Sequence, residues 1–205
     1  MTYVYFLLLF LYLSTSFIKD LTISLLLKFL VGFLGLYFFR DYYKFKMKLK
    51  FFSIFLSIFT GLLIAFIWIY SLNIYPIFNI KIETKTNNIE LFNYNIVDLI
   101  LKIITFTILT PVIEEFFMRF WLIRFIISKY WQKIELGKFT LSSFLFTTLF
   151  FGFSHTLWIQ GIISGILFNL LYYNRKNIES CILAHFTANF FLMIYVLITQ
   201  KTIFW

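Results

Sequence analysis

The chain has 205 residues and a formal net charge of +9, because 18 Lys and Arg residues outnumber 9 Asp and Glu residues. Hydrophobic residues make up 61% of the chain and charged residues 13%, whereas about a quarter of a typical soluble domain is charged. Since a fold of this size cannot hide so much apolar surface from water, the composition excludes a soluble enzyme and predicts an integral membrane protein.

Seven stretches are apolar enough for membrane-crossing helices, which need about 20 mostly apolar residues. In chain order they are 3–18, 21–39, 51–72, 99–124, 139–156, 157–173 and 178–199. The runs are continuously apolar rather than alternating, so they favour helices, which satisfy their own backbone hydrogen bonds inside lipid. The sequence predicts an all-α fold, a polytopic membrane helix bundle of about seven transmembrane helices.

Basic residues are concentrated between alternate pairs of these spans. Eleven of the 18 Lys and Arg residues lie in the segments 40–50, 124–138 and 174–177. A seven-span topology puts these segments on one side of the membrane, and the positive-inside rule makes that side cytoplasmic. We therefore expect a multi-pass plasma-membrane protein with a cytoplasmic N-terminus and an external C-terminus. The net charge indicates this topology in a lipid bilayer, and no nucleic-acid partner is expected.

The fourth span contains three charges within the segment Pro111-Val-Ile-Glu-Glu-Phe-Phe-Met-Arg119. Each charge costs roughly 2.5–3.5 kcal/mol at the centre of a membrane helix, so each requires a reason. Glu115 and Arg119 are four residues apart and share a helix face, which predicts an ion pair. Glu114 is rotated by about 100° from that face, so a packing role leaves it unexplained and a chemical role is favoured. Pro111 is expected to bend the helix and loosen its backbone hydrogen bonds.

The two histidines of the chain also lie in apolar spans. His155 closes the fifth span, and His185 precedes Asn189 by four residues on one face of the seventh. A single histidine in a membrane helix is commonly a helix–helix hydrogen-bonding group. Together with Glu114, however, these residues supply a general base, a second water-binding group and hydrogen-bond donors, which is enough to hydrolyse an amide.

The candidate site residues lie at different depths if the helices are straight and span the whole membrane. In straight, full-length helices Glu114 lies near mid-membrane, His155 near the external end, and His185 about 10 Å from the cytoplasmic end. We therefore expect some helices to be short, broken or tilted around a water-filled cavity. Gly161 and Gly165 have the small-x-x-x-small spacing of a close helix contact.

Three motifs follow one another in the second half of the chain: Glu-Glu-x-x-x-Arg from Glu114, Phe-x-x-x-His from Phe151, and His-x-x-x-Asn from His185. This ordered set resembles the CPBP family of intramembrane proteases, CAAX prenyl endopeptidases and bacteriocin-processing or immunity proteins. The resemblance covers roughly 99–195. It implies a variable N-terminal membrane region, a catalytic core and a short tail, with bounds of 1–95, 96–199 and 200–205.

The resemblance also implies roles for individual residues. The catalytic residues would be Glu114, His155, His185 and Asn189, and the supporting residues Glu115 and Arg119. The first glutamate and the first histidine would bind and activate a water, and the later histidine and asparagine would line the oxyanion side. The implied function is an intramembrane endopeptidase of the glutamic type that cuts a membrane-anchored or lipidated substrate, with no cofactor expected.

Other functions use the same residues. A zinc-dependent version of the protease would take Glu114, His155 and His185 as ligands and keep one position open for water. A proton-linked transporter would use these three residues as a relay, although the chain shows no duplicated halves. A non-catalytic immunity or scaffold relative would keep the fold without the chemistry. Peptide cleavage in reconstituted membranes separates these possibilities.

Overall fold

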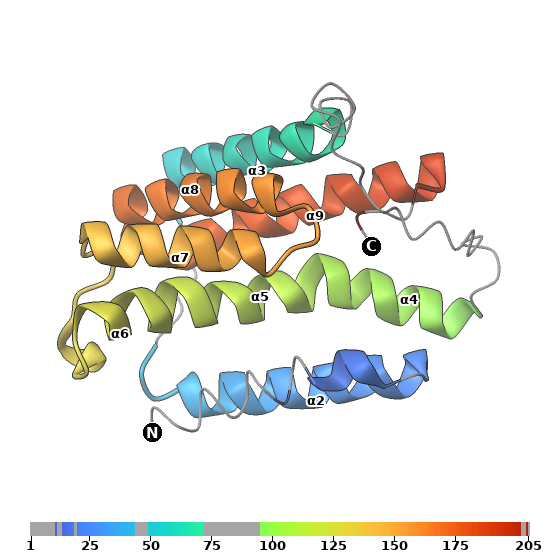
Figure 1. The fold of residues 1–205 in the computed structure, drawn as a ribbon, viewed down its shortest axis with the longest axis horizontal. Coiled ribbons are helices and arrows are strands. Elements are labelled where there is room, and N and C mark those ends of the chain that lie inside the picture. The colour runs from blue at the N-terminus through green and yellow to red at the C-terminus, as the bar shows by residue number, and fades with distance from the viewer. Residues whose placement is uncertain are drawn as a thin grey trace.

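The computed structural model describes residues 11, 14–18, 20–43, 49–71, 95–201 and 204, and this part of the chain is all-helical. Long helical segments run in alternating directions and pack side by side as a bundle (Figure 1). They are α2 (Leu21–Phe39), α3 (Phe51–Ser71), the continuous segment α4 to α6 (Ile96–Ile127), α7 (Leu141–Phe153), α8 (Trp158–Arg175) and α9 (Glu179–Thr199). The predicted all-α class is confirmed.

Four helices in the described part of the chain are long and apolar enough to cross a membrane. They are Leu21–Phe38, Phe51–Ser71, Ile96–Ile127 and Glu179–Thr199, and they correspond to four of the predicted spans. Large apolar side chains on the outer helices are exposed, such as Phe33 of α2 and Phe55 and Phe66 of α3. Because such an apolar exterior suits lipid rather than water, the fold is that of a membrane helix bundle. Ten of the sixteen residues of the predicted span 3–18 lie outside the described residues.

The predicted spans 139–156 and 157–173 form as helices, but α7 is shorter than the predicted 139–156. It has 13 residues, which makes it about 20 Å long, and a hydrocarbon core is roughly 30 Å thick. Thr140 caps its N-terminus by accepting a hydrogen bond from the Ser143 N–H, and the chain turns after Phe153 before α8 begins at Trp158. Because the helix is short, His155 lies at the same depth in the bundle as Glu114, and both side chains can line one cavity.

Small residues bring α7 and α8 into close contact. A Cβ added at Gly161 would lie 2.9 Å from Gly152 Cα, and one at Gly165 would lie 3.2 Å from the Thr148 backbone. The predicted close contact at Gly161 and Gly165 is confirmed. Asn169 of α8 adds a polar link, because its amide nitrogen donates to the hydroxyls of Thr147 and Thr148, each at 3.0 Å. This tight pair of helices holds the turn that carries His155.

The charged helix is irregular on both sides of its central turn. π-helical segments at Thr105–Leu109 (η4) and Phe116–Leu122 (η5) flank α5 (Thr110–Glu115). Pro111 lies in the first turn of α5 and has no N–H to donate, so the regular hydrogen-bond ladder cannot continue through it. The predicted loosening of the backbone is confirmed, and π-helical turns of this kind are frequent at functional sites.

The turns after α2, α6 and α8 lie at one end of the bundle, on the left in Figure 1. The described basic residues of these turns and of the helix ends beside them are Arg40, Lys50, Lys129, Lys133, Lys138, Arg175 and Lys176. Lys44, Lys46 and Lys48 lie outside the described residues. The grouping of the three basic loops at one end is as expected. Arg124 differs from them, because it is buried and its Nε donates to the Ile134 carbonyl at 2.8 Å.

Candidate active site

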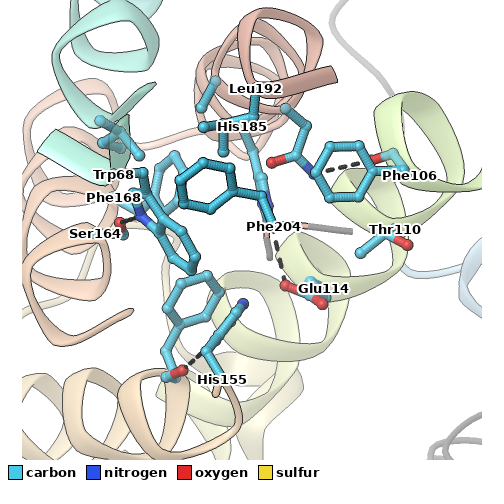
Figure 2. A pocket seen from close by; sticks show the side chains of 14 residues that line it. Trp68, Phe106, Thr110, Glu114, His155, Ser164, Phe168, His185, Leu192 and Phe204 are labelled. Atoms are coloured by element: carbon cyan, nitrogen blue, oxygen red, sulfur yellow. Dashed lines mark hydrogen bonds and ion pairs between the residues drawn. The ribbon is translucent and has the colours of Figure 1, made fainter. Parts of the chain in front are cut away.

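A cavity of about 90 Å³ lies between α3, α5, α8, α9 and the turn after α7 (Figure 2). Its lining residues are Ile64, Trp68, Phe106, Thr110, Glu114, Phe151, His155, Ser164, Phe168, His185, Ala188, Asn189, Leu192 and Phe204. The volume is enough for several water molecules. The four residues proposed as catalytic, Glu114, His155, His185 and Asn189, therefore line one water-sized cavity although they are far apart in sequence.

Glu115 and Arg119 form an ion pair beneath this cavity. Both side chains are 0% exposed, and Arg119 Nη1 lies 3.1 Å from Glu115 Oε1. The Arg119 guanidinium also lies over the rings of Phe151 and Phe168, at 4.8 Å and 5.1 Å from their centroids. Such contacts stabilise a cation that is removed from water. The ion pair predicted from the sequence spacing is present, and it fixes η5 against α7 and α8.

Glu114 lies in a different environment from its neighbour. Its side chain is 28% exposed, and it lines the cavity rather than joining the ion pair. Its Oε2 atom lies 4.0 Å from His185 Nε2 and makes no hydrogen bond within the described chain. Consecutive residues on a helix point about 100° apart, so one carboxylate is buried with a cation and the other faces the cavity.

The partners of the two histidines decide which ring nitrogen carries the proton. His185 Nδ1 lies 2.9 Å from Glu115 Oε1, and His155 Nδ1 lies 2.6 Å from the Phe151 carbonyl oxygen. An ionised carboxylate and a carbonyl only accept hydrogen bonds, so each Nδ1 carries a proton. In the neutral ring Nε2 is then an acceptor. Both histidines can thus take a proton or a hydrogen bond from a water at Nε2.

Asn189 bonds to the irregular helix opposite it. Its Nδ2 donates to the Phe106 carbonyl at 2.8 Å. In this π-helical segment the Thr110 N–H bonds to the carbonyl of Thr105, five residues earlier. By the same spacing, the carbonyl of Phe106 would accept a hydrogen bond from the N–H of residue 111. Pro111 has no N–H, and Asn189 supplies a hydrogen bond in its place. One of the two amide N–H groups is used in this way.

Replacing Asn189 by Ala is expected to lower the free energy of unfolding by about 1 kcal/mol, because it removes a donor from the part-buried Phe106 carbonyl. Pro111→Ala restores a backbone N–H, so Asn189→Ala is expected to cost less in that background. Unfolding of the single and double variants in detergent micelles measures this coupling. Asn169→Ala, which removes an amide bonded to α7, is expected to add independently to Pro111→Ala. If the effects of Asn189→Ala and Pro111→Ala on the free energy of unfolding simply add, Asn189 does not replace the missing N–H of Pro111.

Sequence reasoning did not find every residue of the cavity. Trp68 of α3 donates from Nε1 to Ser164 Oγ of α8 at 2.8 Å, and its ring lies against His155 with 5.7 Å between centroids. No spacing within the chain predicts such a contact between separate helices. Thr110 also lines the cavity. It lies four residues before Glu114, so the helix-face argument could have found it.

The described side chains can be compared with the ligand groups that hold metal ions in proteins. Among the described residues, no group of three His, Cys, Asp or Glu side chains is placed to hold a metal ion. Zinc takes three such ligands within about 2.2 Å in its catalytic sites. The alternative zinc set of Glu114, His155 and His185 is therefore not brought together as a ligand group in this arrangement.

Comparison with known proteins gives one match. Residues 96–191 match the family model described as type II CAAX prenyl endopeptidase Rce1-like. The matched region begins with α4, ends within α9 and contains the six residues predicted to be catalytic or supporting, whereas Ile64, Trp68, Leu192 and Phe204 of the cavity lie outside it. The comparison with curated proteins and the comparison with solved structures give no match. Over these residues, which are just under half of the chain, the protein is similar to the Rce1-like family of type II CAAX prenyl endopeptidases.

Proposed function

We propose that this protein is an intramembrane endopeptidase in which Glu114 acts as the general base. The observation that carries the proposal is the contrast between the two adjacent acids. Glu115 is fully buried and its Oε1 bonds to Arg119 and His185, whereas the Glu114 side chain is 28% exposed and lines the cavity. A general base needs an acceptor within hydrogen-bond reach of a water.

In the proposed reaction Glu114 takes a proton from a water in the cavity, and the oxygen of that water adds to the scissile carbonyl carbon. The acceptor Nε2 of His155 provides a second hydrogen bond for the attacking water. Glu114 then returns the proton to the leaving amine as the carbon–nitrogen bond breaks. The proton balance is complete within the site, and both products leave with ordinary carboxyl and amino termini.

The oxyanion that forms on the carbonyl oxygen is proposed to face His185 and Asn189. Asn189 has a second N–H beyond the one given to Phe106. Because the Nδ1–H of His185 donates its hydrogen bond to Glu115, His185 can donate from Nε2 only when its ring is doubly protonated. The ion pair with Arg119 holds Glu115 in place, so both act by orienting His185. Donors fixed in advance where charge develops are worth roughly 2.7–4 kcal/mol each in well-studied cases.

The proposed substrate is a membrane-anchored or lipidated peptide, because the family acts on prenylated chain ends and the cavity lies among membrane-length helices. The basic end of the bundle supports a multi-pass plasma-membrane protein whose N-terminus is cytoplasmic and whose C-terminus is external. The division into 1–95, 96–199 and 200–205 also stays a proposal, supported by the bounds of the family match.

Cleavage by the purified protein in liposomes tests this function. Two dye-labelled probes suit it: a farnesylated CAAX peptide, and a peptide with one hydrophobic helix followed by a basic cluster. We expect new peptide termini from at least one probe, detected by mass spectrometry. Proton movement without new termini would favour the transporter instead. An intact fold with neither result would leave a non-catalytic relative.

The proposed mechanism uses no metal. Activity is therefore expected to persist after treatment with a zinc chelator, and metal analysis of the active protein should find far less than one zinc per chain. Loss of cleavage on chelation, restored by stoichiometric zinc, would overturn the glutamic mechanism and leave the protease activity itself in place.

A further inference from the structure

Residues beyond the end of α9 contact the bundle. α9 ends at Thr199, and Gln200 adopts a left-handed conformation with φ of 59°, while its N–H bonds to the Val196 carbonyl. Further along, the Phe204 ring lies 5.8 Å from the ring of Tyr195, which is an earlier residue of α9. Phe204 therefore lies back against α9 and the bundle.

Phe204 forms part of the apolar wall of the active-site cavity. It is only 7% exposed and lies in a small cluster of buried apolar residues with Ala65, Leu157, Leu192 and Val196. Its ring also lies 6.1 Å from that of Trp68. Figure 2 shows Phe204 among the side chains that line the cavity, with His185 and Glu114 nearby. A bulky apolar side chain therefore lines the same cavity as the proposed general base.

The described contacts of Gln200, Lys201 and Phe204 allow Phe204 to leave the cavity wall. The hydrogen bonds of Gln200 and Lys201 in the structure are to the end of α9 itself, at Val196, Leu197 and Thr199. Phe204 is held by apolar contact, which is non-directional and can be exchanged for another apolar side chain. A peptide with its scissile bond at Glu114 must place neighbouring side chains in this same small cavity.

We propose that Phe204 is an intramolecular competitor of the substrate, which forms part of the apolar wall of the cavity in the resting protein. A substrate with a large apolar side chain next to the scissile bond displaces it. This inference rests on the proposed peptidase function. Substrate binds only to molecules in which Phe204 has been displaced. The apparent affinity is therefore the intrinsic affinity multiplied by the fraction of molecules in that open form. The segment thus sets a threshold for substrate entry.

The first test is kinetic and uses whichever of the two probe peptides the wild type cleaves. If the open form is about a tenth of the population, Phe204→Ala is expected to lower KM about tenfold and leave kcat unchanged. Truncation after Lys201 should give the same result. Phe191→Ala removes an identical side chain from the exposed side of α9 and should leave both constants at wild-type values. An unchanged or raised KM in the Phe204 variant and the truncation would overturn the inference.

The second test needs no catalysis. Leu192 lines the cavity and is 4% exposed, and the single native cysteine, Cys181, is fully buried. We expect a maleimide to label Leu192→Cys several-fold faster when Phe204→Ala is added, and not when Phe191→Ala is added. Equal labelling rates would overturn the inference even if cleavage is observed. Faster labelling without cleavage by any variant would show that Phe204 covers the cavity and would overturn the proposed function, and with it the competition with substrate.

Discussion

Replacing Glu114 by Gln is expected to reduce cleavage of the probe peptide by about 10²–10⁴-fold, which is the range that general acid–base catalysis contributes. Gln has nearly the same shape as Glu, but its amide cannot take a proton from water. The protein should fold with almost unchanged stability, because Glu114 is part-exposed and outside the buried ion pair. Initial rates in liposomes and unfolding in detergent measure the two quantities separately.

A matched control is available outside the cavity. Glu135 is exposed in the loop between α6 and α7, so Glu135→Gln makes the same chemical change away from the site and should keep wild-type rates. Wild-type cleavage by Glu114→Gln would remove Glu114 from the role of general base. Loss of folding in that variant would show instead that the carboxylate is structural.

Replacing Arg119 by Met is expected to lower the free energy of unfolding by about 3–5 kcal/mol, because it leaves the Glu115 carboxylate buried without its cation. The double variant Glu115→Gln with Arg119→Met should recover part of this loss, since no unpaired charge is then buried. A double-mutant cycle of unfolding in detergent measures the coupling between them. If the losses in free energy of unfolding from Glu115→Gln and Arg119→Met simply add in the double variant, Glu115 and Arg119 are not coupled.

The control for this variant is an arginine on the surface. Arg40 pairs with Asp41 at 3.6 Å, and its side chain is 53% exposed. Ion pairs of this kind contribute about 0–1 kcal/mol, so Arg40→Met should have a small effect. The contrast between the two arginines, and between Glu114 and Glu115, tests directly whether burial decides which charges stabilise the bundle.

Local patterns in the sequence were sufficient for much of the fold. The predicted span 21–39 is the helix Leu21–Phe39, and 51–72 is the helix Phe51–Ser71. The length of an apolar run is a local property, so it can be read without knowing what packs against it. The span 139–156 was predicted too long. Its end depends on where α7 meets α8 at Gly152 and Gly161, which is a contact between helices.

The candidate site divides in the same way. The sequence by itself determined the membrane bundle, the ion pair of Glu115 with Arg119, and the separation of Glu114 from that pair, because spacing along one helix fixes which side chains share a face. Only the tertiary structure decided the partners across helices: Glu115 for His185, Phe106 for Asn189, and Phe204 in the cavity. These contacts depend on helix tilt and irregular turns, which arise from the packing of the whole bundle and leave no periodic pattern in the sequence.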